Sequence, residues 1–179
     1  SSKGNVHEGG IRVPAVVRWP AGIKGGRQVD ALSGYIDVYP TLQALAGTKD
    51  SPPNKLDGIN LLPVIRDGKK PPKRDWFSYI AQGSPGKLAI TAEPWKLVLV
   101  NGTPAQADLT QPAGPPVVEL FNLENDPGEK TDLLAQEPER AAALLKRLQE
   151  HYELKIDGIP HFRDGAKEFT APKDWIIQE

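Results

Sequence analysis

The 179-residue sequence contains neither cysteine nor methionine. Without cysteine these residues can hold no disulfide, no thiolate zinc site and no cysteine nucleophile, and the usual indication of redox compartment is lost. An excess of charge of one sign is also missing, because the formal net charge is only -1. Such a chain has no overall field that would attract nucleic acid or an anionic membrane surface, so any attraction for an anion must be local.

Long hydrophobic runs are missing as well. No apolar stretch approaches the roughly 20 residues that cross a bilayer, and the opening residues lack the apolar core of a signal peptide. We therefore expect neither a nucleic-acid partner nor a membrane partner. The length suits one domain, or one small domain and a piece of another. Because no methionine opens the chain and a dense motif follows at once, we expect a fragment of a longer protein.

Glycine and proline are plentiful, with 17 and 18 residues, which indicates many loops and turns between short elements. The nearly continuous apolar run at residues 13–19 predicts a strand buried in a parallel sheet. Helical spacing begins at residue 37, where Asp37 is a plausible N-cap, and Gly47 predicts the end of this helix. A second short helix is predicted over residues 61–66, with Asn60 as its cap.

The second half of the chain has a different pattern. A polar, basic stretch at residues 69–74 is the best candidate for a boundary. Short β-type runs follow, and the loops between them are too short for crossover helices, so they predict an antiparallel sheet. These runs cover residues 76–81, 88–91, 95–100 and 117–122. A helix with an apolar stripe is predicted from residue 138 to about 154, and it should cover one face of the sheet.

Four segments carry the most specific signal: KGNVHEGGIRVP at residues 3–14, DVYPT at 37–41, LDGINLLP at 56–63 and LFNLENDPGE at 120–129. In their order and spacing they resemble the formylglycine-dependent sulfatases of the alkaline-phosphatase superfamily. Residues 95–97 also fall where these enzymes carry a similar strand. The chain is thus similar to the C-terminal portion of an arylsulfatase-type enzyme.

The resemblance implies an α/β fold in two parts. Residues 1–68 would form the C-terminal end of the catalytic α/β domain, an alkaline-phosphatase-like layer. Residues 69–155 would form a small α+β subdomain, a four-stranded antiparallel sheet packed by a C-terminal helix, which the residue pattern predicts independently. Residues 156–179 would be an irregular tail. The strand at residues 13–19 would belong to the large sheet, most of which is missing from this chain.

The resemblance also implies site residues. Lys3 matches the lysine that contacts the sulfate group just before the Glu-Gly-Gly segment, so it is the one candidate for a catalytic role. His7 and Glu8 would flank the same site and could contact the substrate or the lysine. A packing role for His7 is at least as well supported, since the family varies between histidine and aromatic residues there. Arg12 is better interpreted as half of a structural ion pair than as an anion ligand.

The missing chemistry is equally informative. The family attacks sulfur with a formylglycine made from cysteine or serine in a Cys-x-Pro-x-Arg type motif, and it uses Ca²⁺ bound by oxygen ligands. The nucleophile motif and the Asp-Asp and Asp-Asn pairs of the calcium site do not occur in this sequence, and we interpret the distant similarity of residues 51–55 as coincidence. We therefore expect Ca²⁺ and formylglycine only in the full-length enzyme, no metal ligand here, and an inactive fragment.

Three functions remain open from the sequence. The first is a fragment of a sulfuric ester hydrolase that cleaves sulfate esters together with its missing N-terminal catalytic part. The second is a phosphatase or phosphonate monoester hydrolase of the same superfamily. The third is a non-catalytic carbohydrate-binding or assembly module. The residues themselves leave the compartment unknown, and the resemblance suggests a periplasmic or secreted protein.

Overall fold

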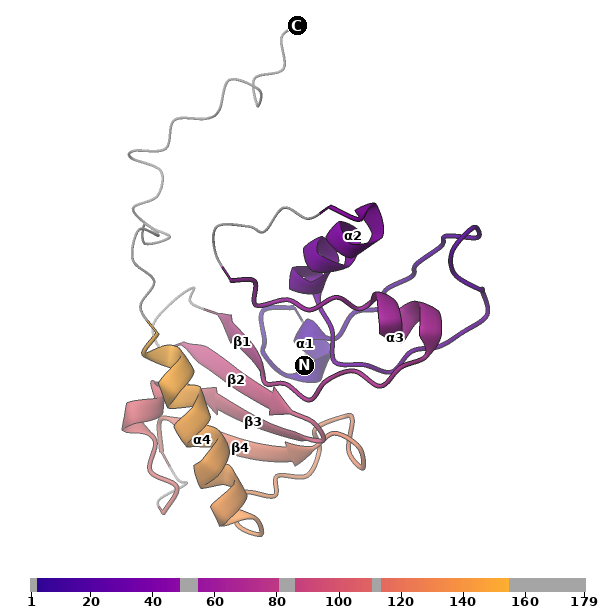
Figure 1. Cartoon of the computed structure of the whole chain (residues 1–179). Helices are drawn as coiled ribbons and strands as arrows, with labels where there is room; N and C mark the ends of the chain where they lie inside the picture. The colour runs from indigo at the N-terminus through magenta and orange to yellow at the C-terminus, as the bar shows by residue number, and fades with distance from the viewer. Residues whose placement is uncertain (1–2, 49–54, 81–85, 111–113, 155–179) are drawn as a thin grey trace, which may run out of the picture.

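A four-stranded antiparallel sheet lies at the centre of the chain (Figure 1), in a computed structural model that describes residues 3–48, 55–80, 86–110 and 114–154. Its strands follow one another in sequence order. They are β1 (Trp76–Ile80), β2 (Lys87–Ala92), β3 (Trp95–Val100) and β4 (Val117–Asn122). The predicted antiparallel sheet is confirmed, and the fold is a mixture of helices and strands.

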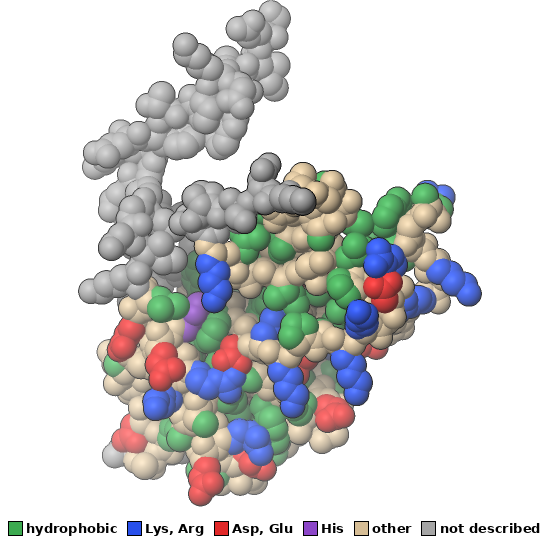
Figure 2. Space-filling view, in the orientation of Figure 1, with side chains coloured by type: hydrophobic (Ala, Val, Ile, Leu, Met, Phe, Trp, Pro, Cys, Tyr) green, Lys and Arg blue, Asp and Glu red, His purple; other side chains and the backbone are tan. Residues whose placement is uncertain are grey.

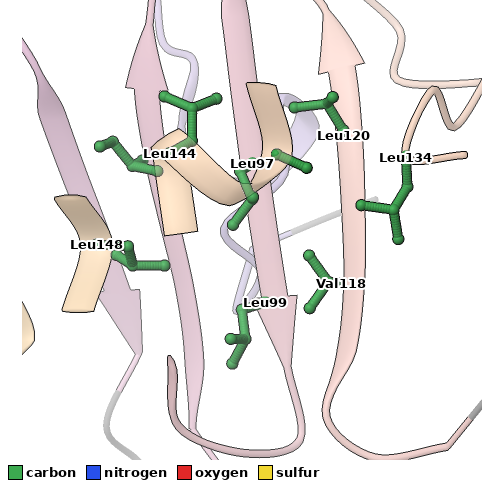
Figure 3. Packing of buried hydrophobic residues seen from close by; sticks show 9 residues of the cluster. Leu97, Leu99, Val118, Leu120, Leu134, Leu144 and Leu148 are labelled. Atoms are coloured by element: carbon green, nitrogen blue, oxygen red, sulfur yellow. The ribbon is translucent and has the colours of Figure 1, made fainter. Parts of the chain in front are cut away.

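The C-terminal helix α4 (Pro138–Tyr152) covers one face of the sheet (Figure 1). Alternate residues of a strand share a face, and the register places Leu97 opposite Ile90 on β2 and Leu120 on β4. Leu144 and Leu148 of α4 point into this layer (Figure 3). The predicted stripe is therefore confirmed at its centre. Burying each leucine side chain contributes about 1.5 to 3 kcal/mol.

The opposite face of the sheet is covered by the N-terminal segment. Val6 is fully buried and packs with Ala89, Val98 and Phe121. The one-turn helix α1 (Glu8–Ile11) follows directly and lies behind the sheet, on the side away from α4 (Figure 1). Because both faces are covered, the strands read as nearly continuous apolar runs.

Along the chain, three short helical elements follow the N-terminal segment and precede the sheet: η1 (Tyr35–Asp37), α2 (Val38–Ala46) and α3 (Leu62–Asp67). A fourth, η2 (Pro104–Gln106), lies between β3 and β4. The helix α2 ends at Gly47, whose φ of 65° is left-handed, as the sequence predicts. The N-cap position of α3 is Leu61 rather than the predicted Asn60, although the Asn60 side-chain oxygen accepts a hydrogen bond from the Leu62 amide at 2.9 Å.

Asp37 occupies the N-cap position of α2, as the sequence predicts, but its side chain does not cap the helix. The carboxylate makes no cap bond to α2 and is instead fully buried. It accepts hydrogen bonds from both terminal nitrogens of Arg74, at 2.7 and 2.6 Å, and from the Ile59 and Gly34 amides. A charged arginine offers this carboxylate stronger, bidentate bonds than helix amides could, and Arg74 is far away in sequence.

Two of the sequence motifs meet at this ion pair. Beside the Ile59 bond, the Leu61 amide donates to the Thr41 hydroxyl at 2.9 Å. A Cβ on Gly58 would lie 2.0 Å from the Ile36 carbonyl oxygen, so only glycine allows this approach. The motifs at residues 37–41 and 56–63 thus have a structural role, which is to hold α2 and α3 together and join them to β1 through Arg74.

The predicted strand at residues 13–19 is not formed. These residues belong to neither helix nor strand, and Val13 and Val16 are 77% and 91% exposed. A buried parallel strand needs a neighbour on each side, and the described chain supplies none beside this stretch. Figure 2 shows hydrophobic side chains, in green, at the surface of the region that contains the N-terminal segment, which is coloured indigo in Figure 1.

The boundary at residues 68 and 69 stays a prediction. The predicted tail at 156–179 and residues 51–54 lie outside the described part of the chain. No helix in the described ranges has the length and apolar character needed to cross a bilayer.

Replacing Leu148 by alanine should open a cavity between α4 and the sheet. The side chain is 2% exposed, and a buried Leu→Ala change costs about 2 to 5 kcal/mol. Urea unfolding of the chain measures this loss. The exposed Leu42 is the control, and Leu42→Ala should change the unfolding free energy much less. Equal losses in the two variants would contradict the packing described.

Replacing Arg74 by methionine should leave the buried Asp37 carboxylate without its cation, at a cost of about 3 to 5 kcal/mol at pH 7. Burial by itself would raise the pKa of Asp37, but the bonds from Arg74, Ile59 and Gly34 outweigh it and lower the pKa. The carboxylate therefore stabilises the fold above its unfolded pKa of about 3.9, and this contribution is lost as the pH falls through the lower folded value.

The difference in unfolding free energy between wild type and Arg74→Met should consequently be largest near neutral pH and shrink below about pH 4. Urea unfolding across this range tests the expectation. Arg66→Met, which removes the exposed Arg66–Asp67 pair, is the control and should have little effect at any pH. A difference that is constant with pH would show that Asp37 does not depend on Arg74.

Candidate functional site

Lys3 lies at the beginning of the described chain, and its side chain is exposed. It is followed by Gly4, whose φ of 88° is left-handed and suits glycine. The Gly4 carbonyl accepts a hydrogen bond from the Lys87 ammonium at 3.1 Å, at the start of β2. Within the described ranges the Lys3 ammonium has no ion-pair partner, so its charge is available to an anion.

The next residues attach this segment to the sheet. The Asn5 side-chain oxygen accepts a bond from the Val6 amide at 2.8 Å and lies 2.8 Å from Nδ1 of His7. The Val6 side chain is buried against the sheet, as described above. Only two residues separate Lys3 from the buried Val6, so the attachment of Val6 to the sheet limits the positions that the Lys3 ammonium can reach.

His7 is held by the protein on both sides of its ring. Its Nε2 lies 3.0 Å from a carboxylate oxygen of Glu119 on β4, and its ring packs edge-on against Phe121 at 6.0 Å. Both ring nitrogens face acceptor oxygens, on Asn5 and Glu119, so both can donate only when the imidazole is protonated. These contacts give His7 a role in anchoring the segment, and its contact with a substrate stays a prediction.

Glu8 is also engaged within the protein. Its carboxylate Oε1 accepts a hydrogen bond from the Lys96 ammonium at 2.7 Å, and Oε2 lies 3.9 Å from Arg12. The ion pair expected for Arg12 is thus present, although its side chain is 64% exposed and the pair contributes little. The Glu8 backbone amide donates to Oε2 of Glu129 at 2.6 Å.

Lys96 and Glu129 are the residues that sequence analysis missed. Lys96 is fully buried on β3, and its Nζ forms an ion pair with Oε1 of Glu129 at 2.8 Å. A buried ammonium is unfavourable unless carboxylates surround it. A lysine inside the apolar run of residues 95–100 was the available signal, because such a position predicts a buried charge that needs a partner.

Lys3, His7 and Glu8 therefore lie on one short segment that crosses the face of the sheet opposite α4. The structure ties His7 and Glu8 to the sheet and leaves Lys3 exposed at the end of the segment. No group of three histidine, aspartate or glutamate side chains in the described ranges is placed to hold a metal ion. The residues present do not fit a calcium site.

Known proteins are similar to this chain in both sequence and structure. The family described as N-sulphoglucosamine sulphohydrolase, C-terminal, matches residues 2–156. Arylsulfatase A of Bos taurus is 33% identical over 189 residues, which cover 98% of this chain and 36% of that protein. The N-acetylgalactosamine-6-O-sulfatase of Bacteroides thetaiotaomicron is 30% identical over 155 residues, covering 82% of this chain and 28% of that protein.

Among solved structures, the crystal structure of Ps i-CgsB is similar with a TM-score of 0.70 and 27% sequence identity, covering 86% of this chain and 31% of that one. The match to arylsulfatase A covers 36% of the length of that protein, so this chain spans about a third of it. The aligned part includes the sheet, α4 and the segment of Lys3. This chain therefore belongs to the sulfatase family and corresponds to its C-terminal portion.

Proposed function

We propose that this chain is the C-terminal part of a sulfuric ester hydrolase and that Lys3 binds the sulfate group of the substrate. The observation that carries the proposal is the exposed Lys3 ammonium, presented at the end of a segment that is fixed to the sheet. The similar proteins are named as sulfatases, which supports a sulfate ester as the substrate of the intact protein.

The chemistry of the reaction gives Lys3 its role. A sulfate ester carries a negative charge, and attack on sulfur moves further charge onto the ester oxygens. A positioned donor aimed at such oxygens typically contributes about 3 to 4 kcal/mol of transition-state stabilisation. Lysine suits this task because its ammonium is a compact charge with three donors.

The nucleophile has to come from outside this chain. We propose that a formylglycine and the oxygen ligands of Ca²⁺ belong to the preceding part of a longer protein, since neither is found in this sequence. Calcium would supply charge neutralisation at the sulfate oxygens there. This chain would contribute Lys3 and the scaffold that carries it. We expect the intact protein to be periplasmic or secreted.

The exposed apolar side chains support such a larger protein. Val16 and Tyr35 are 91% and 85% exposed, and Val13 is 77% exposed, all in the N-terminal third of the chain. Soluble monomers rarely leave large apolar groups together at the surface without a partner. We propose that the catalytic α/β part of the same polypeptide covers this surface.

In the intact protein, Lys3→Ala should lower kcat for an aryl sulfate by about 10² to 10³. The matched control is Lys146→Ala, which removes an exposed lysine from α4 and should leave turnover unchanged. Both variants are compared by steady-state kinetics with nitrocatechol sulfate. Unchanged turnover in Lys3→Ala would contradict the proposed role, and a preference for phosphate monoesters would favour the phosphatase alternative.

The chain alone should hydrolyse no nitrocatechol sulfate, because it contains neither the nucleophile nor the calcium ligands. The assay needs the purified 179-residue chain at high concentration, with the intact protein as the positive control. Turnover by the chain that survives repurification, and that disappears in Lys3→Ala, would show that a complete active site is present in these residues.

A further inference from the structure

Lys96 differs from the other lysines of the described chain because its side chain is fully buried. It projects from β3, on the face of the sheet that Val6 covers, and its register partners are Thr91 on β2 and Phe121 on β4. A buried lysine contributes nothing to solubility and is costly to remove from water. Its position therefore needs an explanation beyond packing, which an apolar side chain would serve better.

Two carboxylates reach Lys96 from separate parts of the chain. Glu8 comes from the N-terminal segment, with Oε1 at 2.7 Å, and Glu129 comes from the loop after β4, with Oε1 at 2.8 Å. The exposed fractions of the Glu8 and Glu129 side chains are only 15% and 4%. The ammonium is thus the common centre that joins three segments, and we name Lys96, Glu8 and Glu129 the ionic anchor.

The backbone reinforces the ionic anchor. Oε2 of Glu129 accepts a hydrogen bond from the Glu8 backbone amide at 2.6 Å, so Glu129 contacts both Lys96 and the first residue of α1. Glu129 itself has a φ of 52°, which is uncommon for a residue with a side chain. Its loop is held in that shape by Asp126, whose carboxylate accepts from the amides of Lys130 and Thr131.

Without Lys96 the anchor would lose its only buried cation. Glu8 and Glu129 would then lie side by side as two poorly solvated carboxylates, and among the described residues the cation left near them is the exposed Arg12, at 3.9 Å from Glu8. The nearby Glu119 carboxylate on β4 would add to the negative charge, although His7 pairs with it. Repulsion between the carboxylates should release the segment of residues 4–12 from the sheet.

Glu8, one member of the ionic anchor, lies five residues after Lys3, and the intervening Gly4 and Val6 are tied to the same face of the sheet. We infer that Lys96 is a positioning residue: by neutralising Glu8 and Glu129 it fixes the segment that aims the Lys3 ammonium at the sulfate group. The inference rests on the proposed function of Lys3. Misplacing a binding group by about 1 Å can reduce the rate about 100-fold.

The test uses the intact protein and a double-mutant cycle. Lys96→Met should lower kcat/KM for nitrocatechol sulfate, and weaken inhibition by inorganic sulfate, by about 10- to 100-fold. In the Lys3→Ala background the same change should have little further effect, because Lys96 acts through Lys3. Fully additive losses in kcat/KM would overturn the inference and leave the proposed function of Lys3 intact.

Two further variants separate positioning from stability. Leu148→Ala weakens the opposite face of the sheet, so it should lower the unfolding temperature without showing coupling to Lys3→Ala. The double variant Lys96→Met with Glu129→Gln removes one cation and one anion together, and it should recover part of the lost kcat/KM. No recovery, or coupling of Leu148→Ala to Lys3→Ala, would indicate a general loss of structure and overturn the inference.

A second readout needs no activity. In Lys96→Met, hydrogen exchange of the amides of residues 4–12 should become faster by about tenfold or more, while exchange of the α4 amides stays unchanged. Unchanged exchange in residues 4–12 would overturn the inference directly. If the wild-type protein cleaves no sulfate ester, the proposed function fails and the catalytic part of the inference fails with it, whereas the exchange result still decides whether Lys96 fixes the segment.

Discussion

The placement of the N-terminal segment on the sheet depends on the ion pairs of the Lys96 ammonium with Glu8 and Glu129. The ammonium lies at the middle of the sheet, and its two carboxylate partners bring the segment of Glu8 and the loop of Glu129 to the same face. Apolar contacts of Val6 continue the attachment. The buried ammonium is unfavourable without carboxylate partners, so its two ion pairs and the contacts of Val6 together hold this segment on the sheet.

A second buried ion pair has the same function on the other side of the N-terminal half. Asp37 and Arg74 connect α2 to the beginning of β1, and the amides of Ile59 and Gly34 also donate to the carboxylate. The motifs that identify the family therefore divide by task. The motif at residues 3–14 presents Lys3, while those at 37–41, 56–63 and 120–129 supply the contacts that hold the presenting segment and its neighbours.

Residues 13–19 have an apolar sequence but no neighbouring strand in the described part of the chain. Their apolar side chains are exposed, and no described strand lies beside them to pair with their backbone. The C-terminal sheet, in contrast, is covered on both faces, by α4 and by the N-terminal segment. The covered sheet thus differs from the N-terminal stretch, whose apolar side chains lack such cover within the described residues.

The sequence by itself determined the local structure and the family. Short β-type runs, loops too short for crossover helices and one amphipathic stripe predicted the antiparallel sheet and α4, because these patterns depend on local backbone geometry. The same patterns did not predict the ion pair of Asp37, assigned residues 13–19 to a strand and missed Lys96 and Glu129. Only the tertiary structure decided those positions, since the partner of each buried charge, Arg74 for Asp37 and Glu8 for Lys96, lies 37 and 88 residues away.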